Sequence, residues 1–137
     1  MATEHTAKAF DSDLQELTRL VAEMGGLAER MIVESVDALI RRDIVLGKRV
    51  VAADAEIDSL QHVIEERAVL TIARRQPMAV DLREIVGAMR VATDLERIGD
   101  HATNIAETVF YMIEGQQMLD KRPKGDMTTF ATTVPGN

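Results

Sequence analysis

The sequence contains no cysteine and no tryptophan, and only 3% of its 137 residues are aromatic. The absence of cysteine excludes disulfides, thiolate metal ligands and thiol catalysis, and it fits a reducing compartment. With so few aromatic residues, a core must be built from aliphatic side chains and methionine, which suits packed helices. Only three prolines are present and none precedes Pro77, so long helices can run uninterrupted through the first half of the chain.

The chain also lacks an excess of positive charge and any long apolar segment. Its formal net charge is -7 and its pI is near 4.9, whereas binding to the phosphates of a nucleic acid requires a basic surface. No apolar run approaches the roughly 18 residues of a membrane span, and the N-terminus has no apolar signal-peptide region. We therefore expect a cytoplasmic protein that neither binds nucleic acid nor inserts into a membrane.

What the sequence does contain is a sustained apolar repeat of about 3.5 residues, which is typical of helices in a bundle. In the first predicted helix, from about His5 to Arg42, the repeat is carried by Phe10, Leu14, Leu17, Val21, Met24, Ala28, Met31, Ser35 and Ala38. A second helix is predicted over Ile44–Arg75 and a third from about Asp81 to Glu114. Gly25-Gly26 interrupts the first pattern, and we interpret this pair as a tolerated weak point in the helix.

The ends of these helices carry the expected signals. Asp43 is placed to cap the second helix, Gln76-Pro77 ends it, and Gly115 is placed to close the third. Long helices joined by very short turns must be antiparallel neighbours. The predicted fold is therefore all-α, a three-helix antiparallel bundle over residues 5–115, followed by a flexible tail at residues 116–137.

Two pairs of carboxylates lie four residues apart, Asp54 and Asp58 on the second helix and Glu96 and Asp100 on the third. Like charges at this spacing oppose helix formation by roughly 0.2–0.5 kcal/mol per pair, so a role other than helix stability is indicated. The midpoint of each pair lies 21 residues from Pro77, so an antiparallel hairpin brings both pairs to the same height. Neighbouring helix axes are roughly 8–10 Å apart. The four carboxylates can then meet around one or two oxygen-liking cations.

Further polar residues continue along the third helix. Asn104 and Glu107 follow the two acids at helical spacing and are weaker candidates as metal ligands. The ordinary alternative is a solvated acidic face balanced by neighbouring arginines, for which Arg90 and Arg97 are close enough in sequence.

Three segments in this order resemble the PhoU family of regulators of bacterial phosphate-specific transport. They are Asp54-Ala55-Glu56-Ile57-Asp58, the stretch from Arg75 to Arg83, and Glu96-Arg97-Ile98-Gly99-Asp100-His101-Ala102. The resemblance implies a three-helix bundle whose acidic motifs hold iron, zinc or another metal, and the four acids match those motifs position by position. It further implies a non-enzymatic negative regulator of phosphate uptake and phosphate-starvation signalling. Its implied partners are the ATPase subunit of a phosphate ABC transporter and a sensor histidine kinase.

The chain departs from this family pattern in length. Familiar members contain two such bundles in tandem, whereas 137 residues suffice for one. We therefore expect a single-repeat form that assembles as a homodimer through an apolar flank. The residues expected to line this flank are Leu20, Ile32, Val36, Leu39, Val86 and Phe110.

Two other functions are compatible with a helical bundle that carries acids. A ferritin-like carboxylate metalloenzyme would use a Glu-x-x-His pair on two of its helices, and no Glu-x-x-His occurs in this sequence. No Ser–His or Cys–His arrangement and no glycine-rich phosphate loop is present either, so we do not expect an enzyme. The third interpretation is a helical dimerisation module whose acids are only solvated surface.

Overall fold

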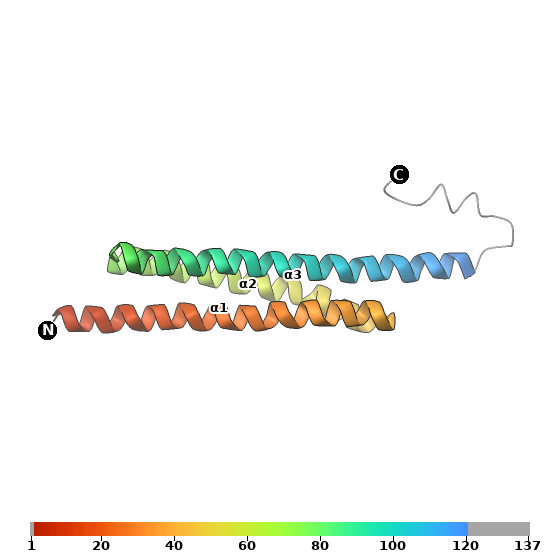
Figure 1. The fold of residues 1–137 in the computed structure, drawn as a ribbon, viewed down its shortest axis with the longest axis horizontal. Coiled ribbons are helices and arrows are strands. Elements are labelled where there is room, and N and C mark those ends of the chain that lie inside the picture. The colour runs from red at the N-terminus through yellow and green to blue at the C-terminus, as the bar shows by residue number, and fades with distance from the viewer. Residues whose placement is uncertain (1, 121–137) are drawn as a thin grey trace, which may run out of the picture.

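The computed structural model describes residues 2–120, with side chains described for residues 7–116. It contains helices α1 (Ala2–Arg41), α2 (Ile44–Arg75) and α3 (Ala79–Asp120). Each helix packs against both of the others. In Figure 1, α1 and α3 run in the same direction and α2 returns between them, so the three form one elongated bundle. The prediction of an all-α, three-helix antiparallel bundle is confirmed.

Both turns lie where the sequence predicts them. Asp43 caps α2, because its carboxylate accepts a hydrogen bond of 3.0 Å from the backbone N–H of Leu46. The backbone reverses through one left-handed residue at each turn, Arg42 with φ of 55° and Gln76 with φ of 47°. At the second turn the N–H of Gln76 still donates to the carbonyl of Ile72, at 3.0 Å, which satisfies one of the orphan carbonyls at the end of α2.

The core is aliphatic, as expected from the scarcity of aromatic residues. Its largest fully buried side chains include Leu17, Met24, Met31, Ile57, Ile64 and Ile85. Two polar residues are also buried, and both are satisfied locally: the hydroxyl of Ser35 donates to the carbonyl of Ile32 and that of Thr71 to the carbonyl of Arg67, each at 2.8 Å. The core therefore contains no unpaired hydroxyl that would indicate a buried site among these residues.

The ends of two helices differ from the sequence prediction. α1 begins at Ala2, before His5, and passes through Gly25-Gly26 without a break. The prediction that Gly115 closes α3 was wrong, since the helix continues to Asp120. Glycine weakens a helix by about 1 kcal/mol but ends it only where the backbone turns left-handed, and Gly115 keeps helical geometry. Residues 116–120 of the predicted tail are thus helical, and residues 121–137 lie outside the described residues.

Some expected flank residues belong to the interior instead. Leu20 is buried in the core, and Ile32 packs against it. The ring of Phe110 lies on α2 so closely that a Cβ added at Gly47 would be 2.7 Å from its Cε1 atom. Val36 and Leu39 are exposed, as expected. No helix within residues 2–120 is sufficiently long and apolar to cross a membrane.

Candidate functional site

The two acidic pairs meet across the contact between α2 and α3. Asp54 and Asp58 come from α2, Glu96 and Asp100 from α3, and these four residues are called the acid cluster below. Asp54 lies close enough to Asp100 for the two carboxyls to interact across this contact. Glu96 interacts in the same way with Asp58 on α2, and also with Asp100 on its own helix. The hairpin register therefore does bring the pairs to one height.

The electrostatics of Asp54 reflect this crowding. Burial raises the pKa of its carboxyl above the ordinary value, and the negative charges of Asp58 and Asp100 raise it further. One group acts in the opposite direction: the hydroxyl of Thr103 on α3 donates to Oδ1 of Asp54 at 3.5 Å. A single long hydrogen bond does not offset two neighbouring carboxylates.

Glu96 is perturbed more strongly. Burial, followed by the charge of Asp100 and the carboxyl contacts with Asp58 and Asp100, raises its pKa to about 7. Such a group is protonated part of the time near neutral pH, when an ordinary glutamate is fully ionised. The negative charge of the cluster is thus not fully balanced by positive charge nearby.

No basic side chain supplies that compensation among the described residues. Arg97, the nearest candidate in sequence, lies 3.8 Å from Asp94, and both of these side chains are about 70% exposed. None of the four acids of the cluster takes part in an ion pair within residues 7–116. The alternative of an arginine-balanced acidic face therefore holds for Asp94 but not for the acid cluster.

The donor set of the cluster fits an oxygen-liking metal ion. Carboxylate oxygens are the ligands such cations prefer, and a cation would replace the missing counter-charge. As they stand, no three Asp, Glu or His side chains within the part described are gathered so that they could hold an ion. A contact between two carboxylates is a weaker requirement than three ligands that converge on one point.

The two weaker candidates are not part of the cluster. Asn104 and Glu107 are exposed on α3, and neither side chain makes a hydrogen bond or ion pair with the four acids among the described residues. Thr103, which sequence reasoning did not select as a site residue, does contact the cluster. Its position three residues after Asp100, on the α2-facing side of the helix, was the signal available in the sequence.

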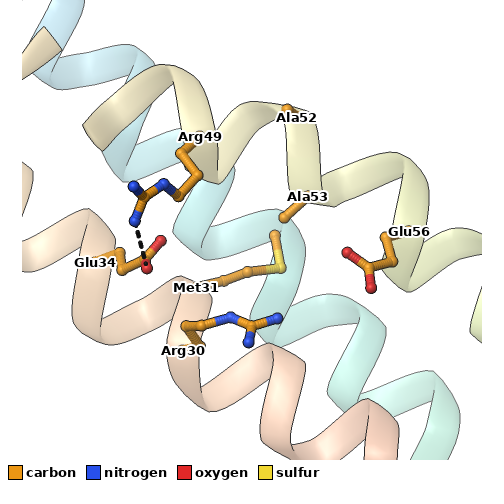
Figure 2. Close-up of a pocket in the computed structure, with 7 residues that line it drawn as sticks. All are labelled: Arg30, Met31, Glu34, Arg49, Ala52, Ala53 and Glu56. Carbon is orange, nitrogen blue, oxygen red and sulfur yellow. Dashed lines mark hydrogen bonds and ion pairs between the residues drawn. The ribbon is translucent and has the colours of Figure 1, made fainter. Parts of the chain in front are cut away.

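A depression lies between α1 and α2, and Figure 2 shows its lining. It has a volume of about 390 Å³ and is lined by Arg30, Met31, Glu34, Arg49, Ala52, Ala53 and Glu56. The guanidinium of Arg49 forms an ion pair with Glu34 at 3.4 Å, and Figure 2 shows this contact at one edge. Two arginines and two glutamates balance one another, so this depression does not favour a cation or an anion.

Comparison with known proteins gives one family. The family model described as PhoU domain matches residues 21–109. A phosphate-specific transport system accessory protein PhoU homolog from Rhizobium meliloti is 50% identical over 109 residues, which cover 80% of this chain and 46% of that protein. A homolog of the same name from Caulobacter vibrioides is 45% identical over 116 residues, covering 85% of this chain and 50% of that protein. The chain therefore spans about half the length of the curated relatives it matches.

Proposed function

The chain belongs to the PhoU family, and from this premise we propose that it is a negative regulator of phosphate uptake and of phosphate-starvation signalling. The single observation that supports this most is the match of residues 21–109 to the PhoU domain, which includes both acidic pairs. The relatives are accessory proteins of phosphate-specific transport by name. The regulator acts without catalysis, as an adaptor between the ATPase subunit of a phosphate ABC transporter and a sensor histidine kinase. It works on the cytoplasmic side of the membrane, where it can bind the ATPase subunit.

The bundle offers more than one surface for such an adaptor. Its three helices are each 32 residues or longer, which corresponds to roughly 48 Å at 1.5 Å per residue. A rod of this length presents three separate flanks, so two partners can be bound without competing for one patch. The acid cluster occupies the flank between α2 and α3.

A metal ion, iron or zinc, is the ligand proposed for that flank. Asp54, Asp58, Glu96 and Asp100 would hold it, and Asn104 and Glu107, one and two helical turns after Asp100, are weaker candidates as ligands. The bound ion supplies a counter-charge that the protein itself does not provide. The support is the raised pKa of Asp54 and Glu96, both caused by burial and by neighbouring carboxylates.

A second copy of the chain is the proposed partner of the flank between α1 and α3. Val36 and Leu39 on α1, with Val91 and Ile98 on α3, are between 37% and 45% exposed. A groove of about 360 Å³ runs between the two helices on this side, lined by Thr18, Val21, Arg83, Glu84, Gly87, Ala88 and Val91. Burying apolar side chains of this size stabilises an interface by roughly 1.5–3 kcal/mol each when burial is complete.

The charges beside this flank support pairing with itself. Asp11 and Glu29 share the helical face of Gly25 on α1, while Arg83 and Arg90 flank Gly87 on α3. None of these four charged residues forms an ion pair within residues 7–116. In a two-fold dimer whose axis is parallel to the helices, the acidic edge of one copy faces the basic edge of the other.

The regulatory proposal is tested in cells that lack their own two-bundle regulator. Expression of this chain should restore repression of a phosphate-starvation reporter in phosphate-rich medium, and purified chain should co-precipitate the ATPase subunit. Arg97 lies on the exposed face beside the cluster, so an Arg97→Glu variant tests whether this face takes part in regulation. Full derepression of the reporter despite normal amounts of folded chain would count against a regulatory function.

A further inference from the structure

Between the two acidic pairs, a side chain of α2 packs directly against the backbone of α3 at a glycine. Gly99 lies between Glu96 and Asp100 on α3, and Ile57 lies between Asp54 and Asp58 on α2. Both residues are buried, and Ile57 has no exposed surface. The contact between them therefore lies in the core, beneath the acid cluster.

The approach leaves no room for a larger residue. A Cβ added at Gly99 would be 3.0 Å from Cδ1 and 3.1 Å from Cγ2 of Ile57, and 3.6 Å from the terminal methyl of Met31. The two distances to Ile57 are shorter than ordinary contacts between carbon atoms, which lie near 3.5–4.0 Å, whereas the distance to Met31 is an ordinary contact. Because Ile57 and Met31 are both buried, neither side chain can move aside without displacing others.

Gly47 on α2 is crowded in a similar way, by Phe110, but other glycines of the helices are not. An added Cβ would meet nothing within 4 Å at Gly115, on the same helix as Gly99, or at Gly26 on α1. Glycine in a helix interior costs about 1 kcal/mol relative to alanine, so stability of the helix does not explain Gly99. The close approach does explain it.

We propose that Gly99 is a positioning residue, which sets the separation of α2 and α3 so that the two halves of the acid cluster are in contact. The carboxylates of one helix reach those of the other because the side chain of Ile57 seats directly on the backbone of Gly99 beneath them. A methyl group at position 99 pushes α3 outward at this level and draws Glu96 and Asp100 away from Asp58 and Asp54. The metal ion of the proposed function then loses ligands from one side, and this part of the inference depends on that function.

The test compares Gly99→Ala with Gly115→Ala, which adds the same methyl group to the same helix in open space. Crystal structures of the metal-free proteins show whether the carboxyls of the two helices still meet. We expect the contacts of Glu96 with Asp58 and of Asp100 with Asp54 to be lost in Gly99→Ala and kept in Gly115→Ala. Unchanged contacts in Gly99→Ala would overturn the proposal. This measurement needs no metal, so its outcome does not depend on the metal proposal.

A second readout uses Zn²⁺, which has no redox chemistry, in calorimetric titrations of the same proteins. Gly99→Ala should bind Zn²⁺ at least tenfold more weakly than the wild type or Gly115→Ala. Equal affinity in all three proteins would refute the positioning role. If the wild type itself binds no Zn²⁺, the metal proposal fails for zinc and the crystal structures alone decide the role of Gly99.

Removing the Ile57 atom that opposes the added methyl group should rescue the Gly99→Ala variant. Ile57→Val deletes the Cδ1 atom that lies nearest to the added methyl. Combined with Gly99→Ala, it should recover part of the lost Zn²⁺ affinity and restore the contact between Glu96 and Asp58. If Gly99→Ala alone does not fold, restored folding in the double variant supports the contact, and a double variant that stays unfolded contradicts it.

Discussion

Asp54 and Asp100 lie 46 residues apart in the sequence, and their carboxyls interact across the contact between α2 and α3. Each is 23 residues from Pro77, in the turn that joins the two helices. Asp58 and Glu96 have the same relationship, each 19 residues from Pro77. Equal rise per residue in two antiparallel helices makes such symmetric positions neighbours. The cluster is thus a direct consequence of the register of one hairpin.

The stability of the metal-free protein should depend on the ionisation of Glu96. Its pKa is raised to about 7 in the folded state from an ordinary value of 4.5, so the folded protein binds the proton more tightly than the unfolded chain. The contribution of this group to stability is therefore fully present below pH 4.5 and is lost as the pH rises through about 7. Glu96→Gln, which stays neutral, should gain stability relative to the wild type between pH 5 and pH 8.

Urea unfolding at pH 5 and at pH 8, in the presence of a chelator, measures the difference in stability between Glu96→Gln and the wild type. Glu107→Gln is the matched control, because Glu107 lies on the same helix, is exposed and does not contact the cluster. Its difference from the wild type should be the same at both pH values. A pH-independent difference for Glu96→Gln would show that the environment of Glu96 is not as described.

Metal binding should require both halves of the cluster. Glu96→Gln combined with Asp100→Asn removes the two charges on α3 and should abolish binding of iron and zinc. The helix content should be unchanged, since both residues lie partly or fully at the surface. Elemental analysis of protein purified without a histidine tag, together with circular dichroism, checks the two expectations.

The control for that experiment replaces the weaker candidates, as Asn104→Ala with Glu107→Gln. Because neither side chain contacts the four acids, this variant should retain at least one bound ion per chain. Undiminished metal in the folded Glu96→Gln, Asp100→Asn protein would remove the acid cluster from consideration as a metal site.

The chain should sediment as a homodimer at micromolar concentration, at twice the 15.1 kDa of one chain. Val36→Glu with Ile98→Glu places charges on the flank between α1 and α3 and should yield a monomer. Val69→Glu is the control, because Val69 is 57% exposed on α2, outside that flank. Wild-type protein that sediments as a 15.1 kDa species would refute the dimer and weaken the single-repeat interpretation.

Gly47 should tolerate no side chain without a loss of stability. A Cβ at this position would be 2.7 Å from Cε1 of Phe110, so Gly47→Ala forces the ring or the helix to move. Overpacking of this kind costs roughly 1–3 kcal/mol. At Gly26 a Cβ has open space, and Gly26→Ala should instead stabilise the protein by about 1 kcal/mol through helix propensity. Chemical unfolding compares the two variants, and equal effects would contradict the assigned contact.

The sequence by itself determined the helices and their order. Apolar residues at a 3.5-residue spacing, an N-capping Asp43 and a Gln76-Pro77 break are local signals, and they act within a few residues of one another. Antiparallel packing follows from turns too short to allow anything else. The common height of the acidic pairs also follows from their equal distances in sequence from Pro77, because the rise per residue of a helix does not depend on its side chains.

Only the tertiary structure decided how closely the helices approach and which residues meet. The sequence marks Gly99 and Gly47 as glycines like any others, whereas the packed bundle places Ile57 against the first and Phe110 against the second. Burial of Leu20 likewise depends on the rotation of α1 against its two neighbours. The physical reason is that helix propensity and capping act along the chain, whereas interhelical distance and rotation are set by the fit of side chains from all three helices together.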